Sequence, residues 1–282
     1  TRCSRDWSSD VCSSDLMRLV SLKPSITDVV LALGAGDRLV GVTKYCSGAP
    51  NAAVAGDYVQ PYVERIVALS PDLVLGSEEN SSRASVEKLR AMGLGVLIFP
   101  FSTVEETLSS VRGIGRALGV AERGEAEAKR IEAKLRELKK LYAGEAPKRV
   151  VVIWGTRPLI AAGTGTYMDE LLPFVGAASA LPSSKIAYPR IGLEELIASD
   201  PDAIVDLSMG SESAASALGP GGGKPWSGVK ELRAVRDGMV IALDASLFRA
   251  GPRLPEGLAK LGELLHRTSE RQTNAPTDQR TN

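Results

Sequence analysis

The chain has 282 residues, with 34 basic and 34 acidic side chains and a formal net charge of zero at pH 7. Its hydrophobic fraction of 44% is ample for a real core, and the length suits one large domain or two lobes of about 130 residues each. Zero net charge argues against a nucleic-acid-binding protein, which usually carries a basic stripe. The one histidine, His266, excludes a His-rich metal site and most Ser-His-Asp or Cys-His schemes. We therefore expect no enzyme, no intrinsic cofactor or metal site, and no nucleic-acid partner.

The two ends of the chain differ from the rest. Residues 1–16 repeat the triplet Ser-Ser-Asp, lack the apolar segment of a signal peptide and look like translated sequencing adapter, so we interpret them as a non-native leader. Residues 267–282 are rich in polar side chains and are predicted to be disordered. With a lost leader the protein is expected in the periplasm or on the outer side of the membrane. If Met17 is the native start, it is cytoplasmic.

Between these ends, short apolar runs alternate with helical patterns. In the first half, buried strands are predicted at residues 19–22, 39–42, 73–75 and 96–99. Helices are predicted at residues 26–33, 63–69, 86–92 and 104–118, the first of them capped by Ser25 or Thr27. This alternation is typical of parallel strands joined by crossover helices, an α/β architecture.

A long helix is predicted at residues 121–142. Ile131, Leu135, Leu138 and Tyr142 recur at spacings of four, three and four, which gives one apolar stripe. The other faces carry mixed charges, as a solvated helix face does. At 1.5 Å per residue the helix is about 33 Å long, enough to connect two lobes.

The second half repeats the pattern, with strands predicted at residues 150–153 and 203–205 and helices at 168–174 and 193–198. One segment recurs closely: residues 64–74 (ERIVALSPDLV) match residues 194–204 (EELIASDPDAI) at a constant offset of 130. Such a duplication indicates two lobes. We expect an N-terminal α/β lobe at residues 17–120, an interlobe helix at 121–146 and a C-terminal α/β lobe at 147–266, each lobe with a central parallel sheet.

Aromatic residues are few, so their positions are informative. Tyr45 and Trp154 with Gly155 follow predicted strands, whereas Tyr58 and Tyr188 each lie six residues before the glutamate that starts a repeat helix. These loops are expected at the cleft between the lobes, where the rings could stack on a flat or bulky apolar ligand. The alternative is that the rings only anchor the loops.

Several segments resemble a known family. Residues 18–28 (RLVSLKPSITD), 33–42 (LGAGDRLVGV), 63–74 (VERIVALSPDLV) and 232–238 (LRAVRDG) are similar to the substrate-binding proteins of ABC importers for cobalamin, iron siderophores and haem. The resemblance runs from about residue 18 to residue 266 and is strongest to the cobalamin-binding branch. It implies a rigid two-lobed fold with a helical backbone, as in periplasmic binding proteins. It also implies an ABC permease as partner and a monomeric carrier.

The resemblance implies roles for individual residues. Tyr45, Tyr58, Trp154, Gly155 and Tyr188 match ligand-lining positions, and Arg249 matches a position that contacts the side chains of the corrin ring. For docking onto the permease, Glu194 falls on the motif position of the second lobe, and Glu78 and Glu79 are candidates in the first. Glu64 and Glu194 could instead be ordinary solvated residues at helix starts.

The segment after the second strand departs from the family pattern, because residues 45–50 read YCSGAP where the family often has Tyr-Cys-Asp-Tyr-Pro. The expected ligand is a corrinoid that carries its own cobalt. The alternatives are an iron siderophore or haem, for which Arg157, Arg190 and Arg249 are candidate contacts, and a role in handling corrinoids in the cytoplasm. Cys46 is expected to be a small apolar side chain, with thiolate coordination of a metal as the alternative.

Overall fold

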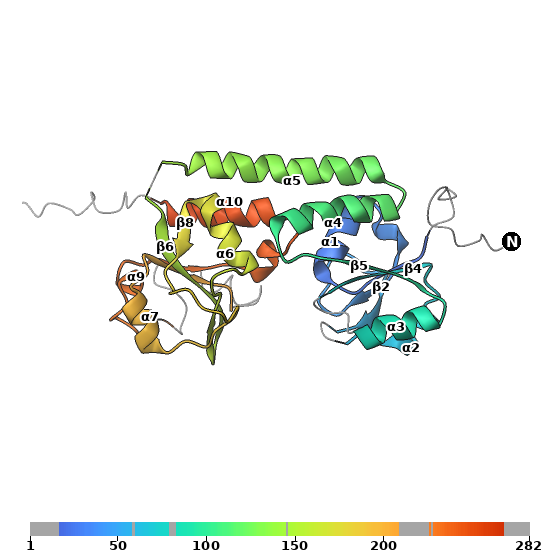
Figure 1. The fold of residues 1–282 in the computed structure, drawn as a ribbon, viewed down its shortest axis with the longest axis horizontal. Helices are drawn as coiled ribbons and strands as arrows, with labels where there is room; N and C mark the ends of the chain where they lie inside the picture. Colours follow the sequence, from blue (N-terminus) through green and yellow to red (C-terminus); the bar gives the residue numbers. More distant parts are fainter. Residues whose placement is uncertain are drawn as a thin grey trace, which may run out of the picture.

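The computed structural model describes residues 17–57, 60–78, 83–144, 146–208, 226 and 228–267. The predictions for residues 1–16, Tyr58, Glu79 and residues 268–282 therefore lie outside the described part of the chain. Figure 1 shows two α/β lobes side by side beneath one long helix. The predicted two-lobed α/β fold is confirmed.

The first lobe is built on one parallel sheet. Its strands are β1 (Leu19–Ser21), β2 (Leu39–Thr43), β3 (Ala53–Gly56), β4 (Leu73–Ser77) and β5 (Gly95–Phe99), in the order β3-β2-β1-β4-β5. Its helices are α1 (Pro24–Ala32), the 3-10 turn η1 (Gly36–Arg38), α2 (Val63–Ala68), α3 (Arg83–Ala91) and α4 (Val104–Ala117). The central strands β1 and β4 are buried along their whole length, because helices cover both faces of the sheet.

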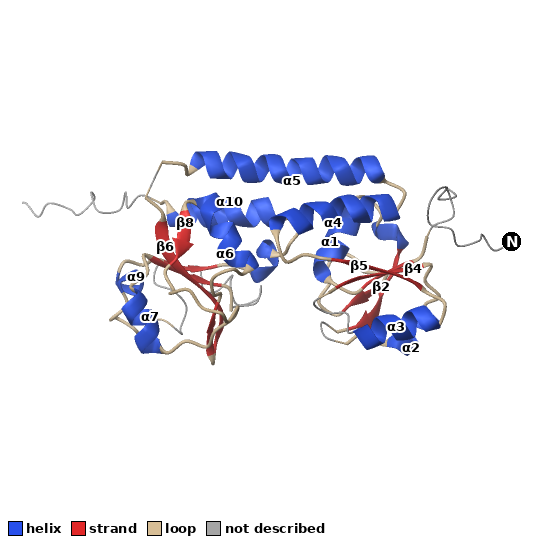
Figure 2. Ribbon diagram, in the orientation of Figure 1, coloured by secondary structure: helices blue, strands red, loops and turns tan. Residues whose placement is uncertain are grey.

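The second lobe has a mixed sheet (Figure 2). Its strands are β6 (Lys148–Thr156), β7 (Leu159–Ala161), β8 (Ala177–Ser179), β9 (Ala203–Asp206) and β10 (Val240–Ala242). Parallel pairs join β6 to β8 and β9, and β9 to β10, whereas β6 and β7 form an antiparallel hairpin that the alternating pattern did not predict. The helical elements are α6 (Tyr167–Leu171), η2 (Leu172–Val175), α7 (Leu193–Ser199), α9 (Arg233–Arg236), η3 (Ala245–Phe248) and α10 (Leu254–Leu265).

The duplicated segment folds in the same way in both lobes. The backbone N–H of Arg18 donates to Asp72 Oδ2 at 2.7 Å, and that of Arg149 donates to Asp202 Oδ2, also at 2.7 Å. Each arginine also donates from its guanidinium to a carbonyl at the end of the repeat helix, at 2.7 Å beside α2 and 2.8 Å in α7. These contacts tie the helix end, the Pro-Asp turn and the start of the neighbouring strand together. The sequence repeat therefore corresponds to a structural repeat.

The long helix α5 (Ala121–Leu141) spans both lobes (Figure 1). It packs on α4 in the first lobe and on η2 and α10 in the second. Ile131, Leu135 and Leu138 are buried in this contact, so the predicted apolar stripe is confirmed. At the far end the rings of Tyr142 and His266 stack with their centroids 4.5 Å apart. The single histidine thus packs beneath the end of α5, in the second lobe.

Candidate functional site

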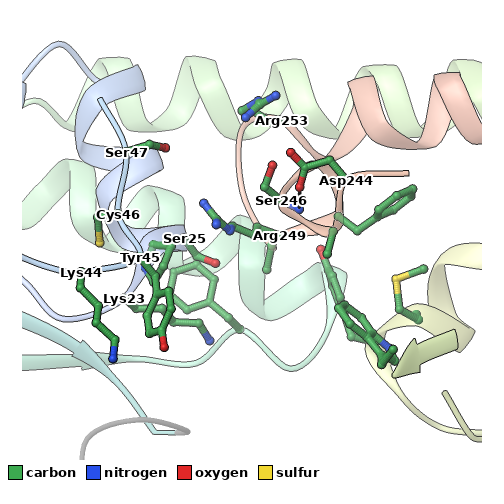
Figure 3. Close-up of a pocket in the computed structure, with 18 of the residues that line it drawn as sticks. Lys23, Ser25, Lys44, Tyr45, Cys46, Ser47, Asp244, Ser246, Arg249 and Arg253 are labelled. Atoms are coloured by element: carbon green, nitrogen blue, oxygen red, sulfur yellow. Dashed lines mark hydrogen bonds between the residues drawn. The ribbon is translucent and has the colours of Figure 1, made fainter. Parts of the chain in front are cut away.

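A cavity of about 910 Å³ opens between the two lobes, near the upper end of the usual range for small-molecule sites. Side chains of both lobes line it (Figure 3). The first lobe contributes Lys23, Ser25, Lys44, Tyr45, Cys46, Ser47 and Phe101, among others. The second lobe contributes Trp154, Tyr167, Met168, Tyr188, Asp244, Ser246, Phe248, Arg249 and Arg253, among others. A ligand in this cavity contacts both lobes at once.

The first-lobe wall follows from the topology of the parallel sheet. Lys23 lies just after β1, Tyr45 just after β2 and Phe101 just after β5. The carboxyl ends of parallel strands meet at one edge of a sheet, where α/β proteins commonly bind ligands. Three loops far apart in the sequence therefore form one surface.

Helix α1 begins closer to this surface than predicted. Its N-cap is Lys23 and Pro24 occupies the first turn, so the prediction that Ser25 or Thr27 caps the helix is wrong. The physical reason is that proline has a fixed φ and no N–H, which suits the first helical position. Thr27 is buried within the helix, where its hydroxyl donates to Ser21 Oγ at 2.8 Å.

The structure brings three of the predicted aromatic residues to the cavity: Tyr45, Trp154 and Tyr188. Trp154 and Tyr188 pack edge to face with their ring centroids 6.4 Å apart. Tyr45 and Tyr188 are each 50% exposed, and the Lys44 ammonium lies over the Tyr45 ring, 4.9 Å from its centroid. Trp154 and Gly155 lie within β6, not in a loop after it, and Gly155 is outside the cavity wall.

Two other aromatic residues of the cavity wall, Phe101 and Tyr167, were not predicted from the sequence. Phe101 follows β5 just as Tyr45 follows β2, so its position directly after a predicted strand was the signal that could have identified it. Tyr167 starts α6, and burial raises the pKa of its hydroxyl well above the ordinary value. Trp154 Nε1 is buried without a hydrogen-bond partner among the described residues. An unsatisfied buried donor costs about 1–3 kcal/mol, and an acceptor on a ligand would offset that cost.

Positive charge predominates in the cavity wall. Among the described residues of the wall, the charged side chains are the four cations Lys23, Lys44, Arg249 and Arg253 and one carboxylate, Asp244. Asp244 Oδ1 already accepts a hydrogen bond of 2.8 Å from the backbone N–H of Ser246, which caps η3. The cavity therefore suits a ligand with acceptor oxygens or negative charge at its edge.

One ion pair joins the lobes beside the cavity. Arg249 Nη1 lies 3.8 Å from Asp28 Oδ2, and Asp28 belongs to α1 of the first lobe. Burial raises the pKa of the Asp28 carboxyl, and the opposing effect of Arg249 and Arg253 is smaller. The ion pair therefore holds Arg249 at the edge of the cavity, next to the first lobe.

Cys46 lies in the wall with its thiol already engaged. Thr27 Oγ1 lies 3.1 Å from its sulfur and Thr43 Oγ1 lies 3.2 Å from it, both within hydrogen-bond distance. Within the described ranges, no group of three or more His, Cys, Asp or Glu side chains has an arrangement that could hold a metal ion. Arg157 and Arg190 are exposed and lie outside the cavity wall, so of the three arginines considered for a siderophore only Arg249 lines it.

The candidate docking glutamates lie away from the cavity wall. Glu194 is exposed in the first turn of α7, and Glu78 is exposed directly after β4. Glu64, the repeat equivalent of Glu194, forms an ion pair with Lys88 at 2.8 Å, and this hydrogen bond lowers the pKa of the Glu64 carboxyl. In Figure 1, α2 and α7 lie on the side of the molecule opposite α5. None of the helices in the described part of the chain is long and apolar enough to cross a membrane.

Comparison with known proteins agrees with this architecture. The model of the periplasmic binding protein family matches residues 19–247. A vitamin B12-binding protein of Vibrio cholerae is 27% identical over 241 residues, which cover 84% of this chain and 84% of the relative. A solved periplasmic haem-binding protein from Pseudomonas aeruginosa is 30% identical with a TM-score of 0.76, covering 88% of this chain and 92% of that one. The solved vitamin B12-binding protein BtuF of Vibrio cholerae, at 24% identity, has a TM-score of 0.76 over 88% of this chain and 96% of its own, and so supports the fold alone.

Proposed function

Because the chain belongs to the periplasmic binding protein family, as a substrate-binding protein of the vitamin B12, haem and siderophore importer class, we propose that it captures a corrinoid between its lobes. It then delivers this ligand to the permease of an ABC importer. Members of this family carry ligands and are not enzymes, which agrees with the expectation from the sequence. The ligand brings its own cobalt, so the protein needs no metal site.

The observation that carries the proposal is the interlobe cavity with aromatic rings on both walls. Tyr45 presents a ring from the first lobe, and Trp154 and Tyr188 present theirs from the second. Two aromatic walls suit a flat macrocycle, because each face of the ligand meets a ring. Arg249 at the edge supplies donors for polar substituents.

Haem is the second candidate, and the haem-binding relative at 30% identity favours it. The two ligands make different demands on the protein. A haem iron is usually held by an axial side chain such as His, Cys, Met or Tyr, whereas a corrinoid with both axial ligands in place needs only stacking and hydrogen bonds. Tyr45 lines the cavity and is the candidate for coordination of iron, in competition with its hydrogen bond to the Lys44 side chain.

Titration of visible absorbance with cyanocobalamin and with haem tests the proposal. Cyanocobalamin should bind the full chain with a Kd below about 10 µM, which corresponds to about −7 kcal/mol. Absence of binding at that level would exclude the corrinoid function. Tyr188→Ala should weaken binding about tenfold, since one stacked ring contributes on the order of 1–3 kcal/mol, and Tyr188→Phe should restore it.

Tyr45→Phe separates the two ligands. The variant keeps the ring and loses only the oxygen, so corrinoid affinity should be unchanged. Haem affinity and the haem absorbance spectrum should change if the Tyr45 oxygen coordinates the iron. An unchanged unfolding temperature in both phenylalanine variants is the control that the lobes are intact.

For delivery, we place the docking surface on the side opposite α5. Glu194 is the candidate in the second lobe, with Glu78 and Glu79 in the first. The exposure of Glu194 and Glu78 and the placement of α2 and α7 on one side support this surface. We also propose that the protein acts as a monomer in the periplasm, and the match to periplasmic binding proteins supports the location.

A further inference from the structure

We propose that Arg130 of the long helix α5 is a positioning residue for ligand binding, because it holds the turn that carries Arg249. The inference deepens the proposed function and rests on it, since it takes Arg249 as a contact of the ligand. Arg130 itself lies outside the cavity wall. Its effect on the ligand is therefore exerted through the turn at residues 249–253.

This turn joins η3 to α10 at the edge of the cavity. Arg249, Ala250 and Arg253 line the cavity, and the two residues between them in the sequence, Gly251 and Pro252, are buried. In Figure 3 the side chain of Arg249 extends from the turn toward the first lobe. The five residues belong to no helix or strand, so the place of the turn depends on its contacts with neighbouring elements.

Helix α5 holds the turn from one side. Arg130 Nη2 donates to the carbonyl oxygen of Pro252 at 2.7 Å. The same guanidinium donates to the Glu127 carboxylate twice, from Nε to Oε2 at 2.9 Å and from Nη2 to Oε1 at 2.7 Å. The Glu127 side chain is only 15% exposed. Two parallel hydrogen bonds to a carboxylate fix the plane of a guanidinium, so the second N–H of Nη2 is aimed at Pro252.

Helix α1 of the first lobe holds the turn from another side. A Cβ added at Gly251 would lie 3.7 Å from the carbonyl oxygen of Ser25, so the turn packs on the start of α1. Arg249 Nη1 lies 3.8 Å from Asp28 Oδ2 on the same helix. The turn is thus placed between α1 and α5, and the contact with Arg130 presses it against the first lobe.

A firmly held turn favours binding because ordering a side chain at a binding site costs free energy. Without the hydrogen bond from Arg130, the turn and the guanidinium of Arg249 have more freedom before the ligand arrives. Ligand affinity should then fall even though no group that touches the ligand has been removed.

The chain offers a matched control on the same helix. Arg123 of α5 also donates to a backbone carbonyl of another element, from Nη1 to the oxygen of Leu33 at 3.2 Å. Leu33 follows the last turn of α1, whereas the cavity is lined by residues at the start of that helix. Arg123 therefore makes a similar contact that does not reach the cavity turn.

The test measures the Kd of each variant by absorbance titration with cyanocobalamin or haem, whichever the wild-type chain binds, and the free energy of unfolding in urea. Arg249→Gln should weaken binding about tenfold, as expected for a lost hydrogen bond from a charged group. Arg130→Gln should weaken it several-fold. The double variant should bind no more weakly than Arg249→Gln alone, because Arg130 acts through Arg249. Arg123→Gln should bind as the wild type does, even where it loses as much stability as Arg130→Gln.

The outcomes separate this inference from the proposed function. If neither ligand binds to the wild-type chain, the proposed function fails and the inference falls with it. If a ligand binds but Arg249→Gln or Arg130→Gln binds it as tightly as the wild type, the inference alone is overturned. The same holds if the losses of Arg130→Gln and Arg249→Gln add up in the double variant, or if Arg123→Gln weakens binding as much as Arg130→Gln.

Should Arg130→Gln fail to fold, Glu127→Gln replaces it in the same series. This variant leaves Arg130 in place and weakens the contact that orients its guanidinium. Its loss of affinity should likewise disappear when Arg249 is already replaced, and an undiminished loss would overturn the inference.

Discussion

The contact between α4 and α5 allows a test of how close helix packing stabilises the fold. Gly115 and Gly124 face each other across these helices. A Cβ added at Gly115 would lie 2.8 Å from the Cα of Gly124 and 3.2 Å from its backbone nitrogen. Both are backbone atoms that cannot rotate away, so Gly115→Ala forces the helices apart. We expect this variant to be less stable than the wild type.

Two opposing terms decide the magnitude. Alanine improves helix propensity by about 1 kcal/mol, whereas overpacking a well-packed contact costs about 1–3 kcal/mol. Because the clash involves backbone on both sides, we expect the upper part of that range and a net loss of about 1–2 kcal/mol. For a chain of this size each kcal/mol corresponds to roughly 2–4 °C in Tm.

Urea unfolding followed by circular dichroism, together with a thermal scan, measures the effect. Ala126→Gly, at an exposed position of α5, is the matched control, and it should lose about 1 kcal/mol through propensity alone. If Gly115→Ala were instead more stable than the wild type by about 1 kcal/mol, the helices would have room for the methyl group and the reasoning would be refuted.

Two further predictions concern delivery and pH. Glu194→Lys should leave ligand affinity within about twofold of the wild type and abolish ligand import in cells, because only the docking contact changes sign; normal import would exclude Glu194 from docking. Burial raises the pKa of the Asp28 carboxyl above its ordinary 3.8, so the folded state binds the carboxyl proton more tightly than the unfolded state does. The free energy of unfolding that the protonated carboxyl contributes is therefore lost as the pH rises through the raised pKa. Asp28→Asn should therefore have a higher Tm than the wild type at pH 7, and the difference should shrink as the pH falls from the raised pKa toward 3.8, whereas a difference independent of pH would contradict this sign.

The local pattern of the sequence was sufficient for most of the first lobe. Strands β1, β2 and β4 are apolar runs largely buried in a parallel sheet, and β5 is a partly buried apolar run at its edge, so hydrophobicity alone predicts all four. The three-residue strands β7, β8 and β10 were not predicted, because three residues are too few to show a hydrophobic periodicity. Their positions depend on pairing with longer neighbours.

The cavity was predictable only in part. In a chain with few aromatic residues, Tyr45 was predicted because it follows a strand, and Tyr188 because it precedes a repeat helix. Lys23 lies in residues 18–28, one of the segments that resemble the family, but no role in the cavity was predicted for it. Its signal was a lysine directly before a proline that starts a helix, which is a poor N-cap, but only the fold shows that this lysine is buried and faces the second lobe.

By itself, the neutral composition with one histidine predicted a protein that is not an enzyme, and the repeat with the long amphipathic helix determined that it has two lobes. These properties are local or periodic along the chain, so they can be read without knowing which segments meet. The cavity and its charge were decided by the tertiary structure, because Lys23 and Phe101 meet only at the edge of the first-lobe sheet, and Arg249 reaches the same cavity only when the two lobes face each other. The net charge is zero over 282 residues, whereas the described part of the cavity wall carries four cations and one carboxylate. The overall charge is a sum over the chain, whereas the potential at a site depends on which side chains the fold places there.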